Sequence, residues 1–418
     1  MAGLSTGTTD SEERHRMSTG PMWIGIDAGK TNHHATAINS IGEVVWSKQV
    51  RNDQAAIETL IDKATATATG AQVHWAVDLT NSYAALLLAV LGAAGQTVVY
   101  VPGRMVNTMT STFGESKTDA KDALVIAQTA RMRPDLSTVT TPPEQVAELA
   151  RLTAHRADLA ADWVRGVNRL RDLLGAIFPG LERALDYTQR SPLILLTGFA
   201  TPAEIRDAGE DGLLAHLRGH GAHRPSLAKI AATATEAAQA QTIVLPGEAS
   251  TAALVKRLAA KLLELDRERK DLDKTITGVF RSNPQAEIIE SLPGMGPILG
   301  AEFITVTGGD LAAFAHAGRL ASYAGLAPVS KDSGRVSGNL RRPKRYNRRL
   351  RRVFYLAALS SIKADGPSRA FYGKKRGERM LHKQALLALA RKLVDVLWAL
   401  LRDGRLFERT APVRPVAA

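Results

Sequence analysis

The chain contains no cysteine among its 418 residues, which excludes disulfide bonds and thiolate-ligated metal sites. This absence is compatible with a reducing cytosol, and we expect a cytoplasmic protein. No uninterrupted apolar run is long enough to cross a bilayer, so we expect no membrane partner. The first 20 residues lack the apolar segment of a signal peptide and are typical of a disordered polar tail.

Acidic residues are too few to balance the basic ones. The sequence has 54 Lys and Arg against 41 Asp and Glu, a net charge of +13, which indicates a polyanionic partner. No acidic residue occurs between Gly334 and Tyr355, whereas a solvated helix face would mix both signs. We therefore predict phosphate contacts along this stretch. Its basic residues are Arg335, Arg341, Arg342, Lys344, Arg345, Arg348, Arg349, Arg351 and Arg352.

The first third of the chain has the pattern of an α/β domain. We expect strands at 22–26, 34–39, 43–50, 72–77 and 97–101, and helices from about 53, at 82–94 and at 119–132. Asn52 is expected to cap the first of these helices. Three hairpin strands followed by alternating strands and helices predict an RNase H-like fold. The glycine fingerprint of a dinucleotide-binding fold is missing.

The rest of the chain has the pattern of an all-α protein. Leucines at heptad-like spacing predict two long helices that pair, at about 144–178 and 252–280, interrupted by Arg156 and Arg269. The pair fits either a bundle within one chain or an oligomeric coiled coil. In "SLPGMGPILGAEFI", Gly294 and Gly296 predict a helix–hairpin–helix-like turn whose N–H groups could hold a phosphate, with a plain αα-turn as the alternative.

These patterns predict the following organisation. Residues 1–20 form a tail, 21–140 an α/β catalytic domain, 141–281 a helical region with an insert at 180–245, 282–410 a C-terminal helical domain, and 411–418 a tail.

The stretch "WIGIDAGKTNHHATAI" contains Gly29-Lys30-Thr31, the end of a phosphate-binding P-loop motif. A P-loop needs a further glycine five residues earlier, where Ile24 stands, and it needs a helix after the motif. The alternation that follows predicts a strand instead. Asp27, at the end of the first strand, is then a candidate catalytic carboxylate, although it could simply cap the turn.

Three further acids extend this candidate site. Asp78 ends the strand "VHWAVD", and Asp119 and Asp122 share one face of a helix because they are three residues apart. Singly, each has a structural explanation, since Asp119 and Asp122 also suit the first turn of a helix. Together they predict a carboxylate site for two Mg²⁺ ions of the kind that assists phosphoryl transfer. We expect the four carboxylates to converge.

Four motifs, "IGIDAGK", "VDLTNSY", "KTDAKDA" and "LASYAGLAPVSKDSG", resemble the DEDD-type insertion-sequence transposases, serine-bearing recombinases that use a bridge RNA. The resemblance covers about 23–407 and implies a RuvC-like N-terminal domain. Asp27, Asp78, Asp119 and Asp122 match the four acids of that family, with Asp78 where Glu is usual. Ser333 in "KDSG" matches its catalytic serine.

The resemblance implies an enzyme that cuts and rejoins DNA. Mg²⁺ held by the acids would activate a DNA phosphate, and Ser333 would form a covalent link to it. It also implies a structured guide RNA as partner. Because Asp27 and Ser333 lie far apart in the sequence, we further expect a homo-oligomer, a dimer or tetramer, whose long helices present the serine of one subunit to the acids of another. Without the resemblance, Ser333 is typical of a turn. Ser330 and Ser337 stand close to it, and Tyr346 is the rival nucleophile or a base-stacking residue.

Three other functions remain compatible with parts of this pattern. A RuvC-like structure-specific nuclease would use the acids with water and would not need Ser333. A sugar-kinase or chaperone-type ATPase is suggested by "GIDAGKT", but the further glycine-rich segments of that class are missing. A non-catalytic nucleic-acid-binding protein would leave the acid cluster unexplained.

Overall fold

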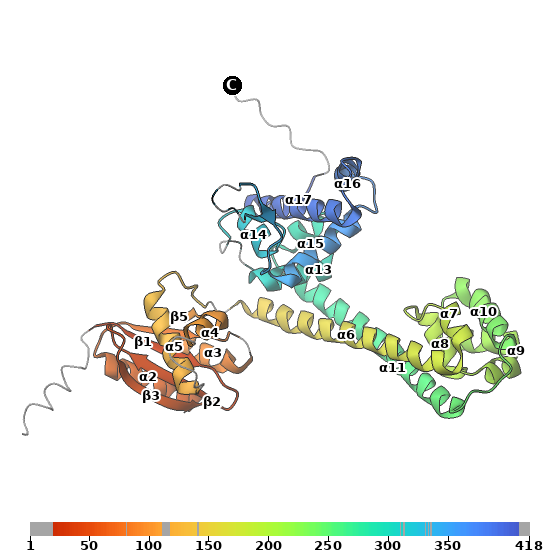
Figure 1. The fold of residues 1–418 in the computed structure, drawn as a ribbon, viewed down its shortest axis with the longest axis horizontal. Coiled ribbons are helices and arrows are strands. Elements are labelled where there is room, and N and C mark those ends of the chain that lie inside the picture. Colours follow the sequence, from red (N-terminus) through yellow and green to blue (C-terminus); the bar gives the residue numbers. More distant parts are fainter. Residues whose placement is uncertain are drawn as a thin grey trace, which may run out of the picture. The chain divides into compact units, whose positions relative to one another are not determined.

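The computed structural model describes residues 20–80, 82–110, 118–139, 142–309, 311, 314–330, 332, 334 and 337–408. The chain divides into two compact units, 1–141 and 142–418. The first has a mixed sheet with helices, and the second is mostly helical where it is described (Figure 1). This confirms the expectation of an α/β domain followed by a helical region.

A five-stranded mixed sheet in the order β3-β2-β1-β4-β5 forms the centre of the first unit. Strands β1, β2 and β3 pair antiparallel, and β4 and β5 continue the sheet parallel to β1. The strands are β1 (Met22–Asp27), β2 (Asn32–Ile38), β3 (Val44–Arg51), β4 (Val73–Val77) and β5 (Val98–Tyr100). The expected strands are therefore present, with ends shifted by one or two residues.

Helices cover both faces of this sheet because the side chains of β1 alternate between them. Ile24 and Ile26 are fully buried in a core shared with α2 and α3. Trp23 packs instead in a cluster that contains Val106 of α4 and Ile126 of α5. The helices are α2 (Gln54–Ala68), the short η1 (Ser82–Ala84), α3 (Ala85–Ala93), α4 (Gly103–Thr110) and α5 (Asp119–Met132) (Figure 1).

The turn after β1 leads into a strand, as expected, because β2 begins directly after Gly29-Lys30-Thr31. A P-loop would open a helix there, so the P-loop alternative is excluded. The expected cap of α2 was wrong by one residue. The Asp53 carboxylate accepts the N–H of Ala56 at 2.9 Å, and Asn52 makes other contacts.

Two long antiparallel helices, α6 (Glu144–Ile177) and α11 (Glu248–Arg281), form the spine of the second unit. They pair within the chain, which is one of the two arrangements that the heptads allowed. The residues that interrupted the apolar pattern hold the pair together. Arg156 bonds Asp273 across the pair, and Arg269 lies over the ring of Trp163 at 5.5 Å.

Between the long helices, the insert folds as a helical cluster around an apolar core that it shares with parts of α6 and α11. Its elements are α7 (Pro179–Ala184), α8 (Arg190–Gly198), α9 (Pro202–Gly219), η3 (Arg224–Ser226) and α10 (Leu227–Gln239). No helix within the described ranges is long and apolar enough to span a membrane.

A third core gathers the C-terminal helices around the ends of α6 and α11. Its helices are α12 (Ala286–Ser291), α13 (Pro297–Thr307), α14 (Ala317–Tyr323), α15 (Arg348–Ser361), α16 (Pro367–Gly377) and α17 (His382–Asp403). A two-stranded hairpin, β6 (Val329–Ser330) and β7 (Leu340–Arg341), lies between α14 and α15 in the sequence.

Candidate active site and nucleic-acid surface

Asp27 and Asp78 stand at the carboxyl ends of neighbouring parallel strands. Ile26 of β1 lies opposite Val77 of β4, and each acid is the next residue along its strand. Residues opposite each other in paired strands direct their side chains to the same face of a sheet. Both carboxylates are half-buried. The register therefore brings these two acids to one face at one end of the sheet.

That face is the one covered by α5. A Cβ built on Gly25 would lie 2.2 Å from the carbonyl oxygen of Ala123 and 2.3 Å from the N atom of Ala127. Thr36, opposite Gly25 in β2, donates its hydroxyl to the carbonyl of Ala120 at 3.5 Å. Since Asp27 follows Gly25 by two residues, its side chain shares the face on which α5 lies.

Helix α5 carries the remaining two acids in its first turn. The hydroxyl of Thr118 caps the helix by accepting the N–H of Lys121 at 3.3 Å. Asp122 is half-buried, and its charge raises the pKa of Asp78, so the two carboxylates are close. Asp119 is exposed at the start of the helix. Asp27 and Asp78 thus lie on the face of the sheet that α5 covers, and Asp122 lies in the first turn of that helix.

The surroundings of Asp78 disfavour the ionised form of its carboxyl group. Burial is the largest cause that raises its pKa, and the negative charge of Asp122 adds to it. The backbone N–H of Ala28 opposes the shift by bonding the ionised form. Its Oδ1 is buried and has no hydrogen-bond partner among the residues that the structure describes. A buried carboxylate oxygen without a donor is costly, and a cation is one way to satisfy it.

The donor set fits a hard cation, because all four predicted ligands are carboxylates. Within the described ranges, however, no group of three or more His, Asp or Glu side chains is placed to hold a metal ion. Convergence of all four acids therefore stays a prediction for the metal-bound protein.

Asn52 supports this end of the sheet in a way that the sequence did not indicate. Its side-chain N–H groups donate to the carbonyl of Lys30 at 3.2 Å and to that of Tyr83 at 3.1 Å. It thereby ties the turn that follows Asp27 to the segment that follows Asp78. An Asn directly before a helix is most simply interpreted as a cap, so this contact gave no separate signal in the sequence.

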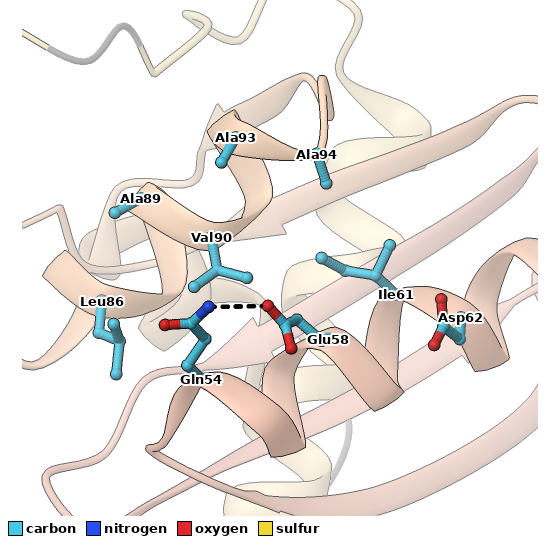
Figure 2. Close-up of a pocket in the computed structure, with 9 residues that line it drawn as sticks. All are labelled: Gln54, Glu58, Ile61, Asp62, Leu86, Ala89, Val90, Ala93 and Ala94. Atoms are coloured by element: carbon cyan, nitrogen blue, oxygen red, sulfur yellow. Dashed lines mark hydrogen bonds between the residues drawn. The ribbon is translucent and has the colours of Figure 1, made fainter.

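A shallow pocket of about 510 Å³ lies between α2 and α3 (Figure 2). Gln54 and Glu58, bonded at 2.8 Å, line one side of it, and Leu86 and Val90 line the other. Helices α2 and α3 pack on the face of the sheet opposite to α5. The pocket is therefore separate from the carboxylates.

In the sequence, the proposed nucleophile stands between β6 and β7. Ser333, and Arg335 beside it, lie outside the described residues. Around them, Val329 pairs with Arg341 and Ser330 with Leu340, and the Asp332 carboxylate accepts the N–H of Asn339 at 2.9 Å. The described part of the segment is therefore a closed hairpin.

The base of this hairpin is fixed on α14 by two contacts. Gly325 has a φ of +66°, and a Cβ on it would lie 2.4 Å from Cγ of Tyr346. Asn347 donates its backbone N–H to the carbonyl of Tyr323 at 2.8 Å and its side-chain N–H to the Tyr323 hydroxyl at 3.1 Å. Any larger residue at 325 would displace the ring. The contacts of Gly325 with Tyr346 and of Tyr323 with Asn347 therefore anchor the base of the hairpin together.

Tyr346 also holds two arginines of the basic stretch. The guanidinium of Arg342 donates to its hydroxyl at 2.7 Å, and that of Arg351 lies 4.9 Å from the ring centre. The Arg342 hydrogen bond, with the positive charges of both arginines, lowers the pKa of Tyr346. The ring therefore packs against Gly325 and Arg351, whereas the sequence left open whether it stacks on a base.

The basic residues fall into two groups. Arg349 donates to the hydroxyl of Thr153 at 3.1 Å, and Arg352 pairs with the buried Glu302 at 3.4 Å. A second group is exposed, and its side chains form no hydrogen bond or ion pair with other described residues. This group, which we call the free cations, consists of Arg341, Lys344, Arg345 and Arg348.

The two glycines of the α12–α13 turn have different surroundings. Gly294 has a φ of +83°, and a Cβ on it would lie 2.1 Å from the carbonyl oxygen of Ala357 in α15. Close packing against α15 is therefore sufficient to explain a glycine at position 294. Gly296 caps α13, is exposed and has no atom within 4 Å of its Cβ position, so it remains accessible to a ligand.

Two family descriptions match the chain. Residues 24–179, which contain all four acids, match a transposase family of DEDD type. Residues 286–373, which contain Ser333 and the basic stretch, match "Transposase IS116/IS110/IS902 family".

Similar proteins cover nearly the whole chain. The insertion element IS116 uncharacterized 44.8 kDa protein of Streptomyces clavuligerus is 54% identical over 95% of this chain and 98% of its own length. The insertion element IS900 uncharacterized 42 kDa protein of Mycobacterium paratuberculosis is 49% identical, over 93% and 97%. The mini-circle putative transposase for IS117 of Streptomyces coelicolor is 26% identical, over 94% and 97%. The chain therefore belongs to the IS116/IS110/IS902 family of insertion-sequence transposases.

Proposed function

We propose that this transposase cuts and rejoins DNA through a covalent serine–DNA intermediate, assisted by Mg²⁺ and directed by a guide RNA. The observation that carries the proposal is the placement of Asp27 and Asp78 at one end of the sheet, on the face that α5 covers, with Asp122 in the first turn of α5. The strand order, with three antiparallel strands followed by two parallel ones, supports an RNase H-like, RuvC-type domain.

Asp27, Asp78, Asp119 and Asp122 are the proposed Mg²⁺ ligands. When bound, the metal neutralises charge on a DNA phosphate and makes its phosphorus more open to attack. The chain contributes the geometry. Strand register positions Asp27 and Asp78, close packing at Gly25 positions α5, and the unsatisfied Oδ1 of Asp78 offers an oxygen to the ion. Two acids from strand ends and two from α5 form the proposed ligand set.

Ser333 is the proposed nucleophile. Its hydroxyl loses a proton and bonds to the DNA phosphorus, and the displaced DNA oxygen leaves as a hydroxyl group. A second DNA hydroxyl then attacks the same phosphorus and releases Ser333, so no phosphodiester bond is lost overall. Tyr346 and Gly325 anchor the described part of the β6–β7 hairpin, and the free cations contact neighbouring phosphates.

DNA and a structured guide RNA are the proposed partners, and the chain acts as a homo-oligomer. We also propose that the helical region ends near residue 281 and that a separate C-terminal domain follows it. The acids and Ser333 belong to different units of the chain. We propose that one subunit supplies the acids and another supplies the serine.

A mixing experiment tests this arrangement. Asp27→Ala and Ser333→Ala proteins should each be inactive in strand exchange, and a mixture of the two should recover part of the activity. A mixture that stays inactive, while both proteins bind DNA and RNA normally, would show that each site is built within one chain. Cleavage by Ser333→Ala without rejoining would favour the alternative function, a RuvC-like hydrolytic nuclease.

A further inference from the structure

A second basic surface lies at the corner between α16 and α17, beyond the stretch that the sequence singled out. Residues 363–383 contain seven Lys and Arg and two acidic residues. Each acid is already paired. Arg369 contacts Asp365 at 3.1 Å, and Lys375 contacts Glu378 at 2.7 Å. The remaining positive charge is therefore not compensated within this segment.

Three cations of this corner are exposed, and their side chains form no hydrogen bond or ion pair with other described residues. They are Lys374 near the end of α16, Arg379 in the connection, and Lys383 in the first turn of α17. We call these three residues the corner cations. An isolated lysine on a surface is ordinary, but three uncompensated cations within ten residues raise the local potential and attract a polyanion.

Arg379 is held in a backbone conformation that favours glycine. Its φ is +63°, in the left-handed region. The N–H of Arg379 bonds the carbonyl of Arg376 at 3.1 Å, and that of Met380 bonds the carbonyl of Lys375 at 3.2 Å. These two bonds define a Schellman motif, in which the residue at the position of Arg379 is usually glycine. An arginine there costs stability, which indicates that its side chain has a use.

Hydrogen bonds also brace the backbone of the corner, which fixes where the side chains of its cations begin. The Tyr372 hydroxyl and Nδ1 of His382 lie 2.7 Å apart and join α16 to α17. Arg376 donates to the carbonyl of Met380 at 2.7 Å, and Gln384 accepts the N–H of Leu381 at 3.0 Å. A preformed surface loses less conformational entropy when it binds a ligand than a flexible one does.

This surface is distinct from the free cations. Those cations precede or begin α15, whereas the chain reaches α16 only after α15 ends at Ser361. A helix of that length spans roughly 20 Å. The family match to the C-terminal region ends at residue 373, before all three corner cations. Nothing in the proposed chemistry uses them.

We propose that Lys374, Arg379 and Lys383 form a second nucleic-acid contact, which binds the phosphodiester backbone without reading sequence. The inference rests on the proposed function for the class of its partner, and not on the carboxylates or on Ser333. Phosphate oxygens are the shared ligand chemistry of duplex DNA and structured RNA, so both are tested separately.

The first test measures the salt dependence of binding with the full-length protein, using a 30-base-pair DNA duplex in one arm and a hairpin RNA of equal charge in the other. Lys374→Gln, Arg379→Gln and Lys383→Gln together should lower the log–log salt slope by about 0.7–0.9 for each phosphate that the variant no longer neutralises, in at least one arm. An unchanged slope in both arms would overturn the proposal.

A matched control separates local contact from net charge. Arg218, Lys229 and Lys261 are exposed cations elsewhere in the second unit, without a described ion pair. Changing all three to Gln removes the same charge. The control variant should keep a steeper log–log salt slope than the corner variant, with whichever nucleic acid the corner variant binds with a reduced slope. If both variants flatten the slope equally, long-range charge explains the effect and the corner is not a binding site.

Arg379→Gly gives a second readout that a merely structural role would not produce. Glycine relieves the left-handed strain, so the melting temperature should rise, whereas loss of the guanidinium should weaken binding severalfold at low salt. Arg379→Lys should retain most of the affinity. Equal affinity of the Gly variant and the unaltered protein in both arms would exclude Arg379 from the contact.

A third variant distinguishes this proposal from the proposed function. Replacing the free cations with Gln should also lower the slope. If the free cations matter and the corner cations do not, only the further inference fails. If neither set alters binding, the nucleic-acid role of the C-terminal domain fails as well.

Discussion

The backbone of Ala123 in α5 lies directly over Gly25 in β1, so close that a Cβ on Gly25 would be 2.2 Å from the carbonyl oxygen of Ala123. Asp122 precedes this contact on the helix, and Asp27 follows it by two residues on the strand. One glycine therefore sets the distance between two of the proposed metal ligands.

Gly25→Ala should separate α5 from the sheet. The added methyl group meets backbone atoms, which cannot rotate away, so we expect a loss of about 1–3 kcal/mol in the free energy of unfolding. Strand exchange should fall more than that loss explains, because Asp122 moves from Asp78. Gly103→Ala is the control, since a Cβ there meets no atom within 4 Å. Equal activity of the two variants would contradict this role of Gly25.

Asp78→Asn should stabilise the fold at neutral pH while it abolishes activity. Burial, with the charge of Asp122, raises the pKa of Asp78, so the folded protein holds this proton more tightly than the unfolded chain. Ionisation of Asp78 therefore costs stability above its folded pKa, and the cost disappears below the unfolded value of 3.8. The variant should melt at a higher temperature than the unaltered protein at pH 7, and this advantage should vanish as the pH falls to that value.

Mg²⁺ should reverse the order of these two melting temperatures. A cation bound to the folded state stabilises the unaltered protein and not Asp78→Asn. Asp62→Asn, at an exposed acid on α2, serves as control and should respond to pH and Mg²⁺ like the unaltered protein. If Asp78→Asn has no advantage at pH 7 in the absence of Mg²⁺, the carboxylate is not strained.

The free cations, changed together to Ala, should reduce the salt slope of DNA binding by about 0.7–0.9 for each phosphate that they neutralise in the unaltered protein. Their exposure and lack of described partners predict little change in melting temperature. Changing Arg349, Arg351 and Arg352 would alter the stability of the fold as well as DNA binding. These side chains contact Thr153, Tyr346 and Glu302, respectively. A salt slope equal to that of the unaltered protein would mean that the free cations do not contact DNA.

Arg352→Ala should destabilise the C-terminal helices through Glu302. That carboxylate is only 4% exposed and has Arg352 as its cation at 3.4 Å. Removal of the arginine leaves a buried charge, at a cost of about 1–3 kcal/mol. Adding Glu302→Gln should recover most of the loss. Thermal melting of the single and double variants measures this, and additive losses would show that the two residues do not interact.

Much of the first unit could be predicted because its signals are local. Alternating apolar residues marked the strands, and the helix expected at 119–132 begins and ends at those residues in the structure. Face sharing between Asp27 and Asp78 depends on a strand register that spans about fifty residues. Spacing along the sequence cannot supply that register.

The contacts that support the site were harder to predict because their partners are distant in sequence. Asn52 resembles a helix cap, and only the folded chain shows it between Lys30 and Tyr83. Tyr346 is one aromatic residue in a basic stretch, and its place on Gly325 depends on how the hairpin folds back. Arg156 appears in the sequence only as an interruption of a heptad, because its partner, Asp273, lies on another helix.

The central claim is that Ser333 becomes covalently joined to DNA at a site that needs the acids. The direct measurement is denaturing electrophoresis of the protein after reaction with its element-end DNA, guide RNA and Mg²⁺, followed by mass spectrometry of the DNA-linked peptide. We predict an adduct on Ser333 that is absent from Ser333→Ala and from Asp27→Asn, although both variants bind DNA and RNA. An adduct that persists in Ser333→Ala, or that maps to Ser330, Ser337 or Tyr346, would contradict the account.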